Sequence, residues 1–328
     1  MALLLLSGLL AGSLALAVSA GALRVPLGGV FHGTLSAAET AVLYQVRLPR
    51  VLLAAVLGGA LAVAGVVFQA LLRNPLADPY VLGVSGGASL GGVIALLLGV
   101  GRLSGLLGEL GITGFAFAGA LLALLLIERV ATVEGHLAVY TLLLSGAIFN
   151  AFSGALIFFL QSLASLEELH AMVFYLMGQV PSPALGRVGL VALAVGAVVL
   201  GVWTLARDFN VLSLGEESAA ELGVDTERVK RRAFVLGSLL TAIAVATAGL
   251  IGFLGLVVPH ALRMLCGPDH RLLVPGAFLG GATFLVLADA VARTAVLPSE
   301  LPVGVVTALV GGPFFLYLLR ARGRSGHV

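Results

Sequence analysis

Long apolar stretches, cut by short polar or Pro/Gly breaks, run along most of this sequence. A bilayer-spanning helix needs about 20 apolar residues, and the pattern predicts nine such helices, at about 2–22, 50–72, 80–99, 112–129, 137–160, 187–206, 233–251, 272–292 and 303–320. Two shorter segments remain, an amphipathic one at 166–179 and an apolar one at 256–266. Counting 256–266 as a partial or re-entrant span gives ten crossings, which places both termini on one side.

The composition narrows the class of protein. The 328 residues are 60% hydrophobic and only 10% charged, whereas a soluble domain carries roughly 25% charged residues. The low charge excludes a disordered chain, and the single cysteine, Cys266, excludes a disulfide scaffold. Unbroken apolar runs argue against a transmembrane β-barrel, whose strands alternate. The sequence predicts an all-α, polytopic membrane protein with about ten transmembrane helices in one domain, residues 1–328.

The first apolar stretch and the glycines add detail. Residues 1–20 end in small residues like a secretory signal, but the first basic residue is Arg24, which favours an uncleaved first helix over a cleaved signal. Some of the 44 glycines lie four residues apart. Examples are Gly83, Gly87 and Gly91, and the pair Gly276 and Gly280. Small residues at this spacing let membrane helices pack closely.

The basic residues predict the orientation. With the termini inside, eleven Arg and Lys residues fall at inner ends and loops and six at outer ones, which indicates a cytoplasmic C-terminus. Arg47, Arg50 and Arg293 fall on the disfavoured outer side. They are either snorkelling anchors or, as we favour, a docking surface for an acidic partner.

One loop differs from the rest of the chain. Residues 207–232 hold eleven charged residues, although the whole chain has only 18 basic and 16 acidic ones. Acidic residues open a short helical run from Glu216 to Leu222, Gly223 provides a stop, and a second short helix can start at Asp225. The two short helices would make this loop compact. The loop is either a cytoplasmic docking surface or a solvated loop.

The chain lacks recognisable catalytic and metal-binding motifs. Its only lysine, Lys230, is followed by Arg231, so a phosphate-binding P-loop cannot form, and another polypeptide must hydrolyse ATP if ATP drives the protein. The histidines are scattered, which predicts no metal site. A net charge of only +2 gives no reason to expect nucleic-acid binding.

A few polar residues lie inside the apolar spans. Asp289 and Arg293 can pair as i,i+4 neighbours. Gln69 and Asn150 favour interhelical hydrogen bonds over a pathway lining.

Several motifs, in order from about residue 40 to 320, resemble one family, the FecCD-type permeases of ABC importers for iron-siderophores, haem and cobalamin. The motifs are Arg47-Leu-Pro-Arg50, Gln69-Ala-Leu-Leu-Arg-Asn-Pro-Leu-Ala-Asp-Pro79, Leu82-Gly-Val-Ser-Gly-Gly-Ala88, Leu214-Gly-Glu-Glu-Ser-Ala-Ala-Glu-Leu-Gly223, Ile251-Gly-Phe-Leu-Gly-Leu-Val-Val-Pro-His260, Leu287-Ala-Asp-Ala-Val-Ala-Arg293, Glu300-Leu-Pro-Val-Gly304 and Gly312-Pro-Phe-Phe-Leu-Tyr-Leu-Leu319.

The resemblance implies a type II ABC importer permease fold in a bacterial or archaeal cytoplasmic (inner) membrane. It also implies a homodimer, or a pair with a similar permease, whose path lies at the subunit interface and alternates its access. Two cytoplasmic ATPase subunits would use ATP and Mg²⁺, this chain would bind no cofactor, and a periplasmic or lipoprotein binding protein would deliver the chelate.

The resemblance also assigns residues. An inner gate falls near Val139, Tyr140 and Thr141, and Arg47, Arg50 and Arg293 would face the binding protein. The segment that couples to the ATPase comprises Leu214, Gly215, Glu216, Glu217, Ala220, Glu221, Leu222 and Gly223.

Two other functions compete with this one. A secondary transporter driven by an ion gradient would need intramembrane carboxylates, and Asp289 beside Arg293 is a poor candidate. A membrane scaffold without transport activity would need no ATPase partner. No residue in the sequence discriminates among siderophore, haem and cobalamin.

Overall fold

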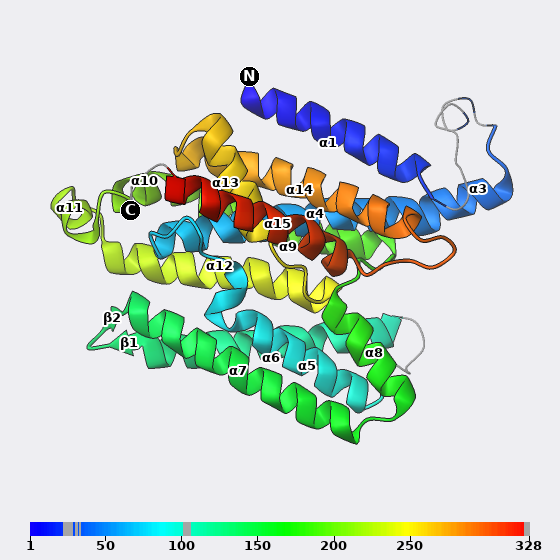
Figure 1. Ribbon diagram of the computed structural model, residues 1–328, viewed down its shortest axis with the longest axis horizontal. Coiled ribbons are helices and arrows are strands. Elements are labelled where there is room, and N and C mark those ends of the chain that lie inside the picture. Colours follow the sequence, from blue (N-terminus) through cyan, green and yellow to red (C-terminus); the bar gives the residue numbers. More distant parts are fainter. Residues whose placement is uncertain (22–28, 30–31, 33, 101–105, 325–328) are drawn as a thin grey trace.

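The computed structural model describes residues 1–21, 29, 32, 34–100 and 106–324, most of them in helices. The long helices lie side by side along one common direction, which is horizontal in Figure 1. The first helix of the chain begins near the middle of that view, and the last one ends toward its left.

Ten apolar helices in the described part of the chain agree with the expected ten crossings. Seven are long and apolar enough to cross a membrane: α1 (Ala2–Ser19), α4 (Leu48–Leu71), α6 (Leu106–Ala131), α7 (Val139–Leu163), α9 (Leu185–Thr204), α12 (Thr226–Ala248) and α14 (His270–Thr294). Three shorter apolar stretches are helical as well: α5 (Val84–Leu97), α13 (Leu254–Cys266) and the part Val303–Tyr317 of α15 (Val303–Arg324). A short helix α3 (Ala37–Ala41) and a π-helical turn η1 (Val42–Arg47) run directly into α4.

The burial pattern is that of a membrane protein. Helix α4 is buried along most of its length, whereas α1, α6, α7 and α9 are mostly exposed despite being strongly apolar. Side chains such as Leu4, Leu125, Phe158 and Leu193 point outward and are more than 60% exposed. Since water would not tolerate so large an apolar surface, these faces suit lipid or a neighbouring subunit.

The helices form two groups joined by α12. Helices α5, α6, α7 and α8 (Leu166–Met177) make one group, and α1, α4, α9, α13, α14 and α15 lie on the other side of α12 (Figure 1). Close approach within the first group depends on Gly87 and Gly91 of α5, where an added Cβ would lie within 2.5 Å of backbone oxygens of α6. In α14 the close contact is made by Gly281, which faces Gly58 of α4, and not by the expected Gly276 and Gly280.

The expected helix over 80–99 is broken near its start. A short 3₁₀ turn, η2 (Pro79–Leu82), precedes α5, and Gly83 between them has a φ of +85°, a conformation that favours glycine. Helix α13 likewise begins after an irregular segment, residues 249–253. The first residues of both helices, Val84 and Leu254, are buried. Irregular backbone inside a membrane protein is tolerated where it lines a cavity or packs against protein.

The remaining elements are short connections. Strands β1 (Thr132–Val133) and β2 (His136–Leu137) form an antiparallel hairpin between α6 and α7, with Thr132 opposite Leu137, which the sequence pattern did not predict. Two-residue strands are too short to produce a recognisable alternation. Helix α8 begins at a capping box in which Ser165 and Glu168 bond each other's backbone N–H.

Candidate functional site

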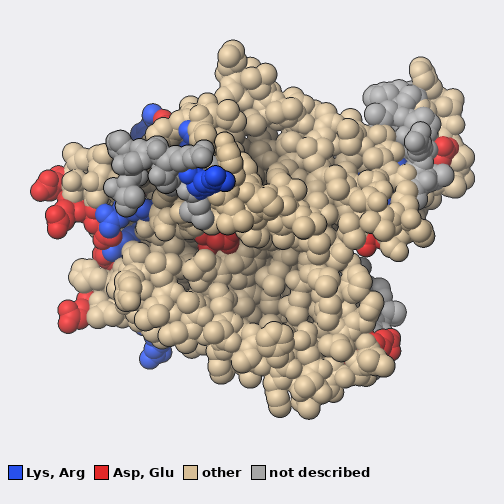
Figure 2. All heavy atoms as spheres, in the orientation of Figure 1, with Lys and Arg blue, Asp and Glu red and all other residues tan. Residues whose placement is uncertain are grey.

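Charged side chains gather at one end of the molecule. In Figure 2 the acidic and basic residues lie mainly at the left end, over α10 (Ala206–Leu212), α11 (Glu216–Glu221), the start of α12 and the β1–β2 hairpin. The middle is almost free of charge on the face shown, and the opposite end shows a few separate acidic patches. This charged end contains the whole loop 207–232 that the sequence singled out.

Helix α11 forms the expected helix at the tip of this loop. Gly215 and Gly223 flank it with positive φ angles of +120° and +85°. The buried Ala219 holds α11 against the protein, while Leu214 and Leu222 on either side of it are 66% and 65% exposed. The tip of the loop therefore presents two exposed apolar side chains at the charged end of the protein.

A helix does begin at Asp225, as expected, but the prediction that it is short and separate is wrong. Asp225 caps the N-terminus of α12 by accepting a hydrogen bond from Arg228 N, and α12 then continues without a break to Ala248. No Gly or Pro interrupts the segment from the cap into the apolar span, so a separate short helix cannot end there. Residues 226–232 therefore belong to the same continuous helix as the apolar span.

Helix α10 is fixed to the start of α14. The Asn210 side chain donates to Asp269 Oδ1 at 2.7 Å and accepts a 2.9 Å hydrogen bond from the backbone N–H of His270. Arg271 pairs with the same carboxylate at 2.7 Å. These hydrogen bonds from Arg271 and Asn210 hold the pKa of Asp269 well below its usual range.

The residues assigned to the inner gate follow the hairpin directly. Val139, Tyr140 and Thr141 form the first turn of α7, at the charged end of the protein. Tyr140 is 78% exposed, so it is placed to meet a neighbouring molecule. The gating role of these three residues stays a prediction.

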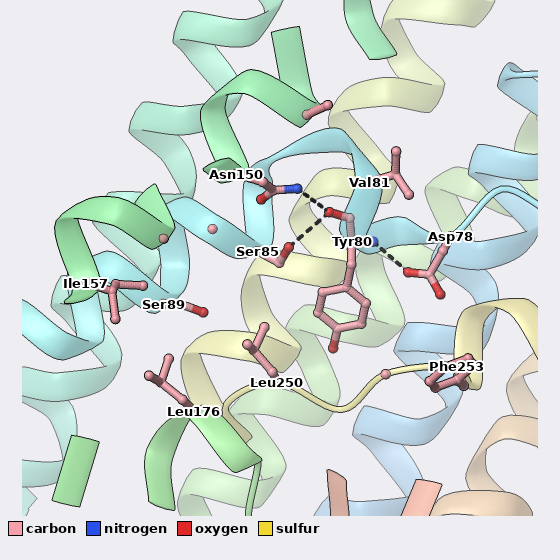
Figure 3. Close-up of a pocket in the computed structure, with 14 residues that line it drawn as sticks. Asp78, Tyr80, Val81, Ser85, Ser89, Asn150, Ile157, Leu176, Leu250 and Phe253 are labelled. Carbon is pink, nitrogen blue, oxygen red and sulfur yellow. Dashed lines mark hydrogen bonds between the residues drawn. The ribbon is translucent and has the colours of Figure 1, made fainter. Parts of the chain in front are cut away.

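A cavity of about 660 Å³ lies between the two irregular segments and α7 (Figure 3). Its lining is mainly apolar, with a few polar side chains from Asp78, Tyr80, Ser85, Ser89 and Asn150. A wide and weakly polar lining suits a large ligand that moves past the wall without being held tightly.

Two hydrogen-bonded residues shape this cavity. Asn150 of α7 donates to the backbone carbonyl of Tyr80 at 2.7 Å, which confirms the expected interhelical bond and places Asn150 on the cavity wall as well. The Tyr80 hydroxyl donates to Ile251 O and accepts from Ile251 N, both at 2.9 Å. Tyr80 thereby joins the broken segment before α5 to the one before α13.

A second interhelical bond supports the same region. Gln69 of α4 donates to Ala77 O and Gly255 O at 3.3 and 3.2 Å and accepts a hydrogen bond from Arg263. This arrangement confirms Gln69 as an interhelical bridge. It fixes the start of α13 against α4.

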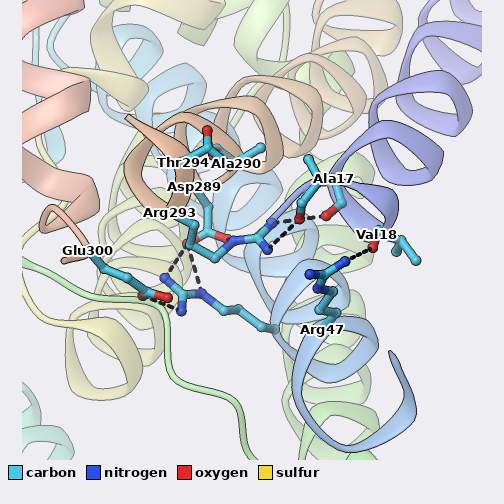
Figure 4. A network of polar contacts seen from close by, with 10 residues as sticks. Ala17, Val18, Arg47, Asp289, Ala290, Arg293, Thr294 and Glu300 are labelled. Carbon is cyan, nitrogen blue, oxygen red and sulfur yellow. Dashed lines mark hydrogen bonds and ion pairs between the residues drawn. The ribbon is translucent and has the colours of Figure 1, made fainter. Parts of the chain in front are cut away.

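The three outer arginines are bound within the protein (Figure 4). Arg50 lies 2.9 Å from Asp289 and 2.7 Å from Glu300, and Arg293 lies 2.9 Å from Asp289, which confirms the expected Asp289–Arg293 pair. Arg47 donates to Val18 O and Arg293 to Ala17 O, both in the last turn of α1. A partner protein would have to compete with these contacts.

No metal-binding group appears among the residues that the structure describes, where no three His, Cys, Asp or Glu side chains come together.

Comparison with known proteins identifies the family. The FecCD transport family matches residues 9–321. The chain is 46% identical to the cobalamin import system permease protein of Halobacterium salinarum, over 84% of this chain and 73% of that protein. It is 43% identical to the hemin transport system permease protein of Yersinia pestis, over 93% of this chain and 92% of that one.

A solved structure agrees along the whole chain. A metal-chelate type ABC transporter in an inward-facing conformation superposes with a TM-score of 0.84 and 31% sequence identity, covering 97% of this chain and 98% of the other. The family match, the relatives and this structure agree with the order of motifs along the sequence. The chain belongs to the FecCD transport family.

Proposed function

We propose that this chain is the membrane-spanning permease subunit of an ABC importer that moves a metal chelate into the cytoplasm by alternating access. The observation that carries the proposal is the whole-chain likeness to a metal-chelate type ABC transporter. The names of the relatives support cobalamin or haem as the chelate, with iron-siderophore as a third member of the class.

The chain is a transport subunit and not an enzyme. ATP and Mg²⁺ are used by a separate ATPase partner, and this chain binds neither. The ATPase drives transport because it binds the two conformations of the permease with different affinities, and only such a difference can shift their populations.

We assign the docking of two ATPase subunits to α11 and the residues that flank it. Leu214 and Leu222 supply an exposed apolar surface, and Glu217, Ala220 and Glu221 are exposed between them. The charged end then faces the cytoplasm of a bacterial or archaeal cell, and the C-terminus with it, which agrees with the bias of basic residues.

The transport path is assigned to the interface with a second copy of this chain or with a similar permease. Helix α7 supports this assignment because it contributes Asn150 to the cavity and also presents Tyr140, Ile148 and Phe152 as exposed side chains. Val139, Tyr140 and Thr141 would form the inner gate at its cytoplasmic end.

The binding protein docks at the opposite end. Arg47, Arg50 and Arg293 are candidates for this contact, and acidic residues of the binding protein would share or replace their internal partners. Of the three, Arg50 has the most accessible internal partner, because Glu300 is 49% exposed while Asp289 is 1% exposed.

Co-purification with the ATPase tests the docking site on α11. Replacing Leu214 and Leu222 with Asp, or Glu217 and Glu221 with Lys, should abolish co-elution of the ATPase in mild detergent. Glu134→Lys is the matched control, since Glu134 is an exposed acidic residue of the hairpin turn at the same end. Retention of the complex by both double variants would contradict the assignment.

The chelate itself is best identified through the binding protein. Mass spectrometry of the ligand that co-purifies with the cognate binding protein should find a cobalamin, a haem or an iron-siderophore. A ligand that contains no metal would contradict the proposed class.

A further inference from the structure

The only lysine in the chain lies at a junction of three elements. Lys230 is in the second turn of α12, and its side chain is 5% exposed. Its ammonium lies 3.0 Å from Glu216 Oε2, 2.5 Å from Glu227 Oε1 and 3.2 Å from the carbonyl oxygen of Leu137. Three acceptors match the three donors of an ammonium group, so the group is fully bonded.

Both backbone polar groups of Leu137, in strand β2 of the hairpin, bind side chains of α12. Lys230 binds the carbonyl of Leu137, and Glu227 Oε2 accepts a 2.8 Å hydrogen bond from the backbone N–H of the same residue. The Leu137 side chain is itself 1% exposed. Glu227 and Lys230 of α12 therefore bind strand β2 through its backbone. These two contacts do not depend on the side chain of Leu137.

The same ammonium binds the helix assigned to ATPase docking. Glu216 is the first residue of α11, and its second carboxylate oxygen lies 3.5 Å from Arg73, just beyond the end of α4. Strand β2 ends only two residues before α7, the helix that carries Tyr140 and the cavity residue Asn150. Ionic and hydrogen-bonded contacts thus join α11 to strand β2 through Lys230, and the chain continues from β2 into α7.

We propose that Lys230, with Glu216 and Glu227, transmits the movement of α11 to the hairpin and the start of α7, and so couples ATP hydrolysis to opening of the path. The proposal rests on the function proposed above. Lys230 is a positioning residue in this scheme, because it acts through α11 and α7 and not on the transported chelate.

A simple anchoring role makes a different prediction. If Lys230 only held α11 in a shape that the ATPase recognises, its loss would weaken the complex. If it transmits movement, its loss should leave the complex intact and separate hydrolysis from transport. The ratio of chelate imported to ATP hydrolysed distinguishes the two, since a merely structural residue changes both quantities together.

Three variants and one control test the proposal in proteoliposomes that contain the full importer and its binding protein. Lys230→Met removes all three contacts, Glu216→Gln removes the ion pair with Lys230 that ties α11 to the junction, and Glu227→Gln weakens the grip on the hairpin. The control is Arg228→Met, because Arg228 lies two residues before Lys230 in α12, is 77% exposed and pairs with Asp225, three residues away.

We expect Lys230→Met and Glu227→Gln to retain the ATPase complex and basal hydrolysis while the import-to-hydrolysis ratio falls at least tenfold in Lys230→Met, and Glu216→Gln should lower the same ratio. Arg228→Met should keep the ratio of the unmodified importer, and the Lys230→Met, Glu227→Gln double variant should be no worse than Lys230→Met alone. An unchanged ratio in Lys230→Met and Glu227→Gln would overturn the proposal, as would loss of the complex in both. Absence of ATP-driven import by the unmodified chain would instead contradict the proposed function.

Discussion

Arg50 and Asp289 lie 239 positions apart in the sequence, yet the guanidinium of one contacts the carboxylate of the other at 2.9 Å. Arg293 binds the second oxygen of the same carboxylate, also at 2.9 Å. Asp289 thus joins α4 to α14 directly, and through Arg293 it joins both to the last turn of α1. One acidic side chain in α14 therefore holds three helices together near the end opposite α11.

Loss of Asp289 should strongly destabilise the protein. Asp289→Asn would leave Arg50 and Arg293 in place without their shared negative charge. Removing one partner of a buried ion pair costs about 3–5 kcal/mol, so the midpoint of thermal unfolding in detergent should fall clearly. Glu300→Gln is the control, because an exposed pair contributes only about 0–1 kcal/mol. Equal midpoints for the two variants would contradict a structural role for Asp289.

Glu300 should limit docking of the binding protein. Its carboxylate occupies one face of Arg50 at 2.7 Å and is half exposed. Glu300→Gln removes this competing charge, so a carboxylate of the binding protein should bind Arg50 more readily. We expect the dissociation constant to fall about threefold to fivefold, as for an exposed ion pair of about 1 kcal/mol, with a steeper dependence on salt. Surface plasmon resonance on importer in nanodiscs measures both quantities, and weaker docking would argue against a role for Arg50.

Tyr80 should be needed for the shape of the cavity. Tyr80→Phe leaves the N–H and C=O of Ile251 without the hydroxyl that both bond. An unsatisfied buried polar group costs about 1–3 kcal/mol, so the variant should unfold at a lower temperature and import more slowly. Ser89→Ala provides the comparison, because Ser89 lines the same cavity and its hydroxyl has no hydrogen-bond partner in the described part of the chain. Tyr80→Phe behaving like Ser89→Ala would show that the bridge to Ile251 is dispensable.

The features that depend on near neighbours in the sequence were predictable. The helix at α11 follows from Gly215, Gly223 and the acidic first turn between them, and the Asp289–Arg293 pair follows from i,i+4 spacing. Hydropathy alone located the spans, because the bilayer imposes both length and composition on them.

The features that depend on distant contacts were not predictable in this way. Nothing in the spacing of Arg50 reveals Asp289 as its partner, so the sequence indicates only a snorkelling or a docking role for Arg50. The spacing of Gly83 indicates only close packing, whereas in the structure Gly83 lies between η2 and α5 with a positive φ angle. In the sequence, Lys230 shows only that a P-loop cannot form. Its three contacts could not be predicted, because the fold brings together the elements that make them.

ATP-dependent import into proteoliposomes tests the central claim most directly. The permease is reconstituted with its ATPase and its binding protein, and uptake of the metal chelate is measured with and without ATP and after collapse of ion gradients. The account predicts uptake that stops when ATP is removed and continues when the gradients are collapsed. Uptake that persists without ATP and follows a proton or sodium gradient would contradict it.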